Sequence, residues 1–314
     1  MATSANQQLS RTARKKRGGS KILPILLAVL LLAGGAWAAK TYFLDGGQPK
    51  NILLMGVDEH KTRTDVVMLA HVDPKQGIVN LVSVPRDTWV EIPCEGIKTC
   101  YSPDKLAHAH AYGGDEGPEL AVATVEKFLG VQIDGYARVD FEGFKQVIDT
   151  LGGVDIVIDK DMYYEDPTPP GLLINFKGSP NPQHLTGKQA LEYVRFRADG
   201  QGDVGRTERT RNFLHAVLDT LKAKGTVSKL PQLWSDMAPY VKTNVDSGTI
   251  AALARVAGKV DTSAIHMEMV PGTPVVLQNG PWVWEADAAK TQELVNRLIH
   301  NPTKEAPKAA EEKK

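Results

Sequence analysis

Three arginines in the second half of the chain stand in a pattern suited to binding an anion. Arg195 and Arg197 lie two positions apart in Tyr193-Val-Arg-Phe-Arg197, so on an extended strand both guanidinium groups would project from one face. Arg206 follows a glycine and opens an apolar repeat with helical spacing, which places it in the first turn of a predicted helix. Free backbone N–H groups at a helix N-terminus and guanidinium groups both bind phosphate-like anions. The pattern therefore predicts an anion site.

The same arginines could instead be surface residues that pair with nearby carboxylates. A cation in the first turn of a helix opposes the helix macrodipole, so Arg206 would occupy an unfavourable position unless an anion bound there. This consideration favours the anion site. The local pattern alone leaves open the alternative of ion pairs with Glu192, Asp199 and Glu208.

Three apolar runs early in the chain predict strands that bring two aspartates and another arginine together. The runs cover residues 51–57, 66–72 and 78–84, and short polar loops connect them. Short connections favour antiparallel neighbours, so the end of the first strand, the start of the second and the end of the third share one sheet edge. We therefore expect Asp58, Asp65 and Arg86 at that edge.

Carboxylates at a shared strand edge can bind a metal ion. Mg²⁺ prefers oxygen ligands and keeps several waters that substrate phosphates can replace, which makes Asp58 and Asp65 candidate ligands. Aspartate is also common in turns, so each residue alone is a weak signal. Arg63 and Arg86 lie close by in the predicted arrangement. A metal ion together with several arginines suits phosphoryl transfer, where catalysis depends mainly on positioning and charge neutralisation.

Motifs of several other catalytic classes are absent from the sequence. It contains no G-x-x-x-x-G-K-[ST] phosphate loop, no G-x-S-x-G nucleophile elbow, no H-E-x-x-H zinc motif and no signature of a nucleotide cofactor. His108 and His110 form a close pair, but their spacing on a helix does not converge on a metal, and we expect surface or cleft packing. With 37 basic and 37 acidic residues, the zero net charge argues against a nucleic-acid-binding protein.

The N-terminal segment predicts a membrane anchor. Six Lys and Arg residues between positions 11 and 21 precede an uncharged apolar run at 22–39, which is long enough to cross a bilayer. The basic flank predicts a cytoplasmic N-terminus and an exported remainder. Ala36-Trp-Ala38 resembles a signal-peptidase site, so a cleaved signal peptide is the alternative. The length of the run favours a retained single-pass anchor in the cell membrane.

These features divide the chain into consecutive regions. We expect a basic cytoplasmic segment at 1–21, the anchor at 22–39, a linker at 40–49, an extracytoplasmic catalytic domain at 50–300 and a disordered tail at 301–314. In an exported domain Cys94 and Cys100 can form a small-loop disulfide, with two free thiols as the alternative.

The pattern of the catalytic region predicts a mixed α/β or α+β fold, with a central, mostly antiparallel or mixed sheet flanked by helices. The expected helices cover 104–112 (with Ser102 and Pro103 as its N-cap and first residue), 117–129 and 141–151, and the expected later strands cover 136–139, 154–158 and 266–270. Residues 160–185 read as a proline-rich irregular excursion, a candidate wall or lid for a cleft.

Several motifs occur in an order that resembles one bacterial family. They are Gly56-Val-Asp58, Arg63-Thr-Asp65, Ser83-Val-Pro-Arg86-Asp87-Thr88, Asp104-Lys105-Leu106 running to Ala111-Tyr112-Gly113-Gly114, Tyr193-Val-Arg-Phe-Arg197 and Gly205-Arg206. Over residues 50–222 the ordered set closely resembles the LytR–CpsA–Psr family of cell-wall assembly proteins. The set is more specific than any single motif.

The resemblance implies a Mg²⁺-dependent phosphotransferase anchored in the membrane. It would move a glycopolymer phosphate from a polyprenyl diphosphate-linked glycan to a peptidoglycan hydroxyl and release polyprenyl phosphate. Asp58 and Asp65 match the family's metal-binding acids. The predicted diphosphate-binding residues are Arg63, Arg86, Lys105, Arg195, Arg197, Arg206 and Thr210, and the predicted catalytic residues are Asp65, Arg86, Arg197 and Arg206.

Two features depart from the family's pattern. Thr210 stands where the family commonly has glutamine, and the segment at 91–101 that carries the cysteines is longer than usual. We expect Asp65 or Asp87 to take the acceptor's proton, and helices at 120–129 and 141–148 to line a groove for the lipid tail. A hydrolase of the same lipid and a non-enzymatic glycopolymer-binding scaffold remain alternatives, because the same residues would serve them.

Overall fold

The computed structural model describes residues 48–58, 60–165, 173–196, 202–223, 238–246, 249, 265–278 and 280–303. The predicted anchor at 22–39, Arg197 and the tail from residue 304 onward lie outside these ranges, and so does the side chain of Arg206. Among the described residues, no helix is both long enough and apolar enough to cross a membrane.

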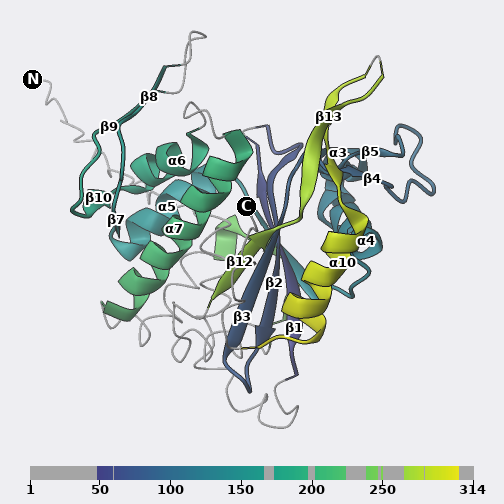
Figure 1. The fold of residues 1–314 in the computed structure, drawn as a ribbon, viewed down its shortest axis with the longest axis horizontal. Helices are drawn as coiled ribbons and strands as arrows, with labels where there is room; N and C mark the ends of the chain where they lie inside the picture. Colours follow the sequence, from purple (N-terminus) through teal and green to yellow (C-terminus); the bar gives the residue numbers. More distant parts are fainter. Residues whose placement is uncertain are drawn as a thin grey trace, which may run out of the picture.

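A six-stranded mixed sheet forms the centre of the molecule (Figure 1). Its strands, in spatial order, are β11 (Lys242–Thr243), β6 (Gly135–Val139), β1 (Lys50–Val57), β2 (Thr64–Asp73), β3 (Ile78–Val84) and β12 (His266–Met269). β1 pairs antiparallel with β2, and β2 with β3, which confirms the pairing predicted from their short connections. β6 runs parallel to β1 and β12 parallel to β3, so the sheet is mixed.

Helices cover both faces of this sheet (Figure 1). On one face lie α5 (Phe141–Leu151), α6 (Gly187–Arg195) and α7 (Gly202–Ala223), and on the other lie α3 (Leu106–Gly113), α4 (Gly117–Leu129) and α10 (Ala288–Val295). Two short helical turns, η1 (Gly114–Glu116) and η3 (Ala238–Tyr240), and one π-helical turn, η5 (Asn296–His300), complete the described helices. The result is the predicted mixed α/β architecture.

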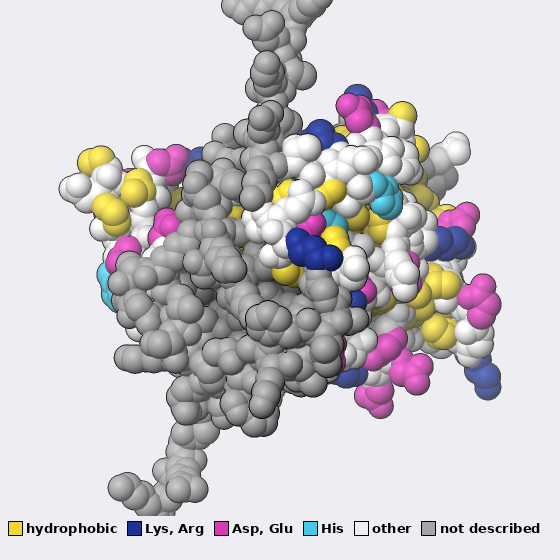
Figure 2. Space-filling view, turned by 90° about the horizontal axis from the view of Figure 1, so that it is seen from below, with side chains coloured by type: hydrophobic (Ala, Val, Ile, Leu, Met, Phe, Trp, Pro, Cys, Tyr) yellow, Lys and Arg dark blue, Asp and Glu magenta, His cyan; other side chains and the backbone are white. Residues whose placement is uncertain are grey.

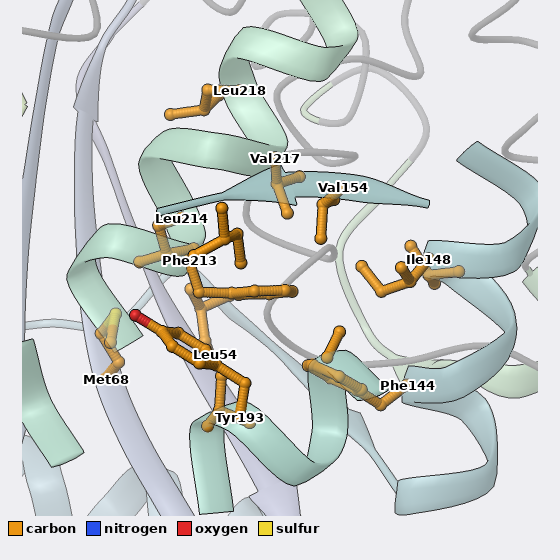
Figure 3. Close-up of a cluster of buried hydrophobic side chains, with 14 of the residues drawn as sticks. Leu54, Met68, Phe144, Ile148, Val154, Tyr193, Phe213, Leu214, Val217 and Leu218 are labelled. Carbon is orange, nitrogen blue, oxygen red and sulfur yellow. The ribbon is translucent and has the colours of Figure 1, made fainter. Parts of the chain in front are cut away.

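Side chains of β1 alternate between two hydrophobic cores. Ile52 and Leu54 pack with α5, α6 and α7, whereas Leu53 and Met55 pack with α3, α4 and α10. In the first core Phe144 of α5 stacks on Phe213 of α7 with ring centroids 5.2 Å apart, close to Tyr193 and Val154 (Figure 3). Because helices cover both faces of the sheet, apolar residues follow one another along β1 and do not alternate with polar ones.

The prediction of an extended strand at Tyr193-Val-Arg-Phe-Arg197 is wrong. This segment ends helix α6, whose last residue is Arg195. Thr186 and Gln189 form a capping box at the start of the helix, and Ala190, Tyr193 and Val194 bury one helical face. Five alternating polar and apolar residues are too few to distinguish the end of a helix from a strand.

Two other helix boundaries differ from the prediction. Helix α3 begins at Leu106, because Asp104 and Lys105 form strand β5 (Asp104–Lys105) and pair with β4 (Trp89–Val90). Helix α7 begins at Gly202, so Arg206 lies in its second turn and not in its first. The position of Arg206 therefore opposes the helix dipole less strongly than expected.

The irregular excursion contains more structure than predicted. Within 160–185, β8 (Met162–Glu165) pairs with β9 (Leu173–Phe176), and β10 (Gln183–Leu185) pairs with β7 (Val154–Ile156). A hairpin of β13 (Gly272–Val276) and β14 (Trp282–Ala286), which no sequence pattern predicted, lies beside β4, and Trp284 N donates to Asp87 O at 2.9 Å (Figure 1).

A disulfide joins Cys94 to Cys100, whose Cα atoms lie 5.5 Å apart. Both cysteines and Ile97 pack against the core on the α3 and α4 side. The surface seen from below mixes Lys and Arg with Asp and Glu over its described part (Figure 2).

Candidate active site

A bulge at the start of β2 sets the position of Asp65. Gly56 pairs with Val66 and Val57 with Thr64, so Asp65 is the extra residue between two registered pairs. A bulge of this kind redirects a side chain at a sheet edge. Arg86, two residues after β3, donates a hydrogen bond from Nη1 to Oδ1 of Asp65. Oδ2 of Asp65 has no hydrogen-bond partner among the described residues.

The turn after β1 surrounds the carboxylate of Asp58. The backbone N–H of Thr62 donates to Oδ1 at 2.9 Å and that of Arg63 at 3.3 Å. The Thr62 hydroxyl lies 3.3 Å from Oδ2, and Nε of Arg63 lies 3.5 Å from the same oxygen. Burial tends to raise the pKa of Asp58, but these hydrogen bonds outweigh it, and the pKa lies below its ordinary value of 3.8. Asp58 is therefore ionised at neutral pH.

A second contact holds this turn against β6. Nζ of Lys61 lies 2.6 Å from Oδ2 of Asp140, the residue that caps helix α5 through the N–H of Gly143. Lys61 adopts φ of 60°, a left-handed conformation that non-glycine residues rarely adopt and that recurs at functional sites. Hydrogen bonds from Lys61 and Gly143 more than offset the effect of burial and hold the pKa of Asp140 below its ordinary value.

Alternating charges continue from Arg86 to Lys105. Nε of Arg86 lies 3.4 Å from Oδ2 of Asp87, and Nζ of Lys105 lies 2.7 Å from Oδ1 of the same carboxylate. The backbone holds the two segments together, because Ala107 N donates to Arg86 O at 2.9 Å and Leu106 N donates to Thr88 O at 2.9 Å. The predicted cations Arg86 and Lys105 thus lie beside each other at the edge that carries Asp65.

Asp104 of β5, next to Lys105, forms a separate cluster with two residues of α3. Its carboxylate accepts hydrogen bonds from the hydroxyl of Tyr112 and from Nδ1 of His108, the latter at 2.8 Å. Burial tends to raise the pKa of Asp104, but these bonds outweigh it and keep the pKa low. Burial and the bond to Asp104 raise the pKa of Tyr112 above its ordinary value. Of the two histidines expected at a surface or cleft, His108 is half-buried and His110 is buried.

Arg195 reaches the same edge of the sheet from α6. Its guanidinium carbon lies 4.6 Å from the ring centroid of Phe141, the first residue of α5. Phe141 follows β6, which runs parallel to β1 and ends beside Gly56. Thr210 is buried in α7, and Arg63 is exposed on the Asp58 turn. The structure thus brings Asp58, Arg63, Asp65, Arg86, Lys105 and Arg195 to one edge, while Arg197 and the Arg206 side chain lie outside the described residues.

The expected lipid groove between 120–129 and 141–148 does not form. Leu120 and Val125 of α4 belong to the core on one face of the sheet, and Phe144 and Ile148 of α5 belong to the core on the other (Figure 1). The sheet separates the two helices, so they cannot line a single groove.

Two carboxylates at the edge have the chemistry of a Mg²⁺ site. Asp58 is ionised, and Asp65 has one oxygen without a hydrogen-bond partner in the described part of the chain. Among the described residues, no group of three or more His, Cys, Asp or Glu side chains is placed to hold a metal. Mg²⁺ commonly takes one or two carboxylates and completes its shell with water and phosphate oxygens, so this donor set fits it.

Comparisons with known proteins show the family of the chain. The family model described as LytR_cpsA_psr family matches residues 34–300. The chain belongs to this family. Members similar to it include TagU of Bacillus mycoides (strain KBAB4) and TagV of Bacillus subtilis (strain 168), both named polyisoprenyl-teichoic acid–peptidoglycan teichoic acid transferases. TagU is 33% identical over 82% of this chain and 81% of the relative. TagV is 30% identical over 80% of this chain and 64% of the relative.

Solved structures of the LytR_cpsA_psr type share the fold. The crystal structure of B. subtilis TagV superposes with a TM-score of 0.66 at 29% identity, over 80% of this chain and 96% of that one. A structure titled "TagT bound to LI-WTA" superposes with a TM-score of 0.60 at 25% identity, over 79% of this chain and 88% of that one.

Two further residues belong to the site, although no sequence pattern assigned them to it. Asp140 holds Lys61, and His110 contacts the carbonyl oxygen of Thr62 at 2.8 Å. The Asp140 position carried a readable signal, because an aspartate before a helical pattern is a common N-cap. His110 was noted only as one of a close pair with His108, and no pattern linked it to the site, since 48 positions separate it from Thr62.

Proposed function

We propose that this protein transfers a glycopolymer phosphate from a polyprenyl diphosphate-linked glycan to a hydroxyl of peptidoglycan. The names of its relatives support the reaction class. The observation that carries the proposal is the alternating series Asp65–Arg86–Asp87–Lys105 beside Asp58, because it joins cations for a diphosphate to carboxylates for Mg²⁺.

Arg86, Lys105 and Arg195 bind the diphosphate in this proposal, together with Arg63, Arg197, Arg206 and Thr210. Guanidinium groups hold phosphate oxygens through paired hydrogen bonds, and the lysine ammonium acts as a point charge. Asp58 and Asp65 would hold Mg²⁺, which when bound would further neutralise the diphosphate charge. Bringing the cations to one edge lets the site stabilise charge that develops on the leaving group.

The reaction is a displacement at the phosphorus nearer the sugar. The oxygen of the peptidoglycan hydroxyl forms a bond to that phosphorus, and the bond from phosphorus to the bridging oxygen breaks. Polyprenyl phosphate leaves with the electron pair. Asp65 and Asp87 both contact Arg86, and one of them accepts the hydroxyl proton.

Residues 22–39 anchor the protein in the cell membrane, with the N-terminus in the cytoplasm and the catalytic domain outside. The apolar run and its basic flank support this topology. Protease added to intact cells or spheroplasts should degrade the domain and leave a membrane-bound N-terminal fragment.

An assay with defined products tests the transfer. The full-length protein in mild detergent would receive lipid diphosphate glycan, Mg²⁺ and peptidoglycan, and released polyprenyl phosphate and covalently attached polymer would be measured. Equal amounts of both products support transfer. Release of polyprenyl phosphate with only free polymer phosphate would identify a hydrolase instead. Binding of the glycan without any release would identify a scaffold.

A further inference from the structure

His110 lies directly beneath the turn that carries Asp58. It projects from α3, is 3% exposed, and places Nδ1 2.8 Å from the carbonyl oxygen of Thr62. A carbonyl oxygen can only accept a hydrogen bond, so the partner assigns the hydrogen to Nδ1 of His110. The imidazole therefore donates to the turn across 48 positions of sequence.

Thr62 passes this contact on to Asp58. Its backbone N–H donates to Oδ1 of Asp58 at 2.9 Å, and its hydroxyl lies within 3.4 Å of both carboxylate oxygens. The same residue thus accepts from His110 through its carbonyl oxygen and donates to Asp58 through its N–H. A shift of Thr62 would move the donors that orient the carboxylate.

Gly117 at the start of α4 allows this helix to pack closely against His110. A Cβ atom there would lie 2.4 Å from the His110 carbonyl oxygen and 3.1 Å from both Cε1 and Nδ1 of the ring. Gly117 has helical backbone angles (φ −55°), so the glycine is needed for this close approach and not for its conformation. The packing of α3 on α4 therefore holds the ring in one place.

The other ring nitrogen shows that packing alone does not account for a histidine here. Nε2 of His110 is buried and has no hydrogen-bond partner among the described residues. A leucine would fill a similar volume without a buried unpaired polar atom. The donor at Nδ1 is the feature that a leucine could not supply.

We propose that His110 is a positioning residue that holds the Asp58 turn in its metal-binding geometry. This inference rests on the proposed function, since it takes Asp58 as a Mg²⁺ ligand. His110 acts through Thr62 and touches neither metal nor substrate. Groups that hydrogen-bond directly to a metal ligand typically change metal affinity about 10–100-fold when they are replaced, and His110 acts one contact further out through Thr62, so we expect an effect at the lower end of that range.

Mn²⁺ binding to the full-length protein in detergent tests the proposal without relying on turnover. Electron paramagnetic resonance would measure the affinity of four variants beside the wild type. His110→Leu removes the donor, and Gly117→Ala forces the His110 backbone and its ring to shift. We expect each to weaken Mn²⁺ binding by about tenfold. His110→Asn keeps an N–H donor near the position of Nδ1, and we expect near wild-type affinity. Asp58→Asn is the reference for a lost ligand.

Hydrogen exchange in the metal-free protein gives an independent readout of the turn. The amide of Thr62, which donates to Asp58, should exchange faster in His110→Leu and at the wild-type rate in His110→Asn. If His110→Leu does not fold, Gly117→Ala and His110→Asn decide the question by the same two measurements.

The outcomes separate this inference from the proposed function. Unchanged Mn²⁺ binding in Asp58→Asn would remove the metal site, whatever the histidine variants do. A different result would overturn the role of His110 alone. In that case Asp58→Asn loses Mn²⁺ binding, but folded His110→Leu, or Gly117→Ala, keeps the wild-type Mn²⁺ affinity and the wild-type exchange rate of the Thr62 amide.

Discussion

Arg86 donates a hydrogen bond to Asp65 and so joins the segment after β3 to the bulge at the start of β2. The same guanidinium lies 3.4 Å from the carboxylate of Asp87, which places one cation between two anions. A diphosphate that approaches Arg86 must therefore compete with both carboxylates. Mg²⁺ on Asp65 would weaken that competition, so we expect metal and donor to bind cooperatively.

Asp65→Asn tests the role of this carboxylate in the metal site. The change should abolish Mg²⁺-dependent transfer but leave the fold intact. The Arg86 and Asp65 side chains are 32% and 24% exposed, and a solvent-screened pair of this kind contributes about 1 kcal/mol or less to stability. Transfer rates over a Mg²⁺ titration and thermal unfolding would be measured together. Full activity of Asp65→Asn across the titration would show that the two-aspartate site is wrong.

Arg206→Ala tests the anion site at the start of α7. Loss of a charge-assisted phosphate contact should cut turnover sharply, by about a thousandfold for an arginine that stabilises transition-state charge. Arg206 lies in the second turn of the helix, where the macrodipole acts weakly, so stability without donor should change little. The measurement pairs thermal unfolding with the transfer rate. Clear destabilisation with near-normal turnover would make Arg206 a structural residue.

Cys94 and Cys100 should be oxidised in protein recovered from outside the cytoplasm. A maleimide reagent should label neither residue until the protein is reduced. The disulfide closes a small loop and so restricts the entropy of the unfolded chain. Its removal should lower the free energy of unfolding by about 2 kcal/mol. The variant Cys94→Ser with Cys100→Ser would measure this change by denaturant unfolding. Labelling of both residues without prior reduction would contradict the prediction.

His71 should make stability depend on pH. It is 4% exposed, and its Nδ1 lies 2.8 Å from Oδ1 of Asn51. Burial lowers the pKa of His71 below its ordinary value of 6.5, and the nearby carboxylate of Asp73 offsets this only in part. The unfolded chain therefore binds the proton more readily than the folded protein. The free energy of unfolding should therefore fall as pH drops below about 6.5, and it should stop falling once pH is below the pKa of His71 in the folded protein.

Unfolding free energies between about pH 5 and 7 would measure this dependence. His71→Gln should flatten the curve over that window, because a glutamine side chain does not titrate there. His60→Gln, at an exposed position, is the matched control for the replacement of a histidine by glutamine. An equal slope in His71→Gln and wild type would show that other groups cause the dependence.

Much of the sheet and of the site could be predicted from local pattern. The apolar runs of β1, β2 and β3 and their short connections determined the antiparallel order, and this order brings Asp65 and Arg86 to one edge. Helices α4 and α5 begin and end at the predicted residues, because glycines follow both and Asp140 caps the second. Strand β6 was also found, although its parallel pairing with β1 was not.

Other features depended on contacts that no local pattern records. Five residues at Tyr193-Val-Arg-Phe-Arg197 fit a strand and a helix equally, and the burial of Tyr193 in the core under α7 selects the helix. Asp104 and Lys105 fit the start of α3, but pairing with Trp89 and Val90 draws them into a strand. In both segments a partner that is distant in sequence decides between helix and strand.

The sequence by itself determined the residue types of the site, the strands that carry them and the family to which the chain belongs. The tertiary structure alone decided that Lys61 meets Asp140, that His110 donates to Thr62 and that α4 and α5 lie on opposite faces of the sheet. The physical reason is that periodicity and turn chemistry act over a few residues, whereas these contacts depend on how whole layers pack. Such packing is set by the burial of apolar surface, which has no direction, so an apolar run shows that a segment is buried but not which partner covers it.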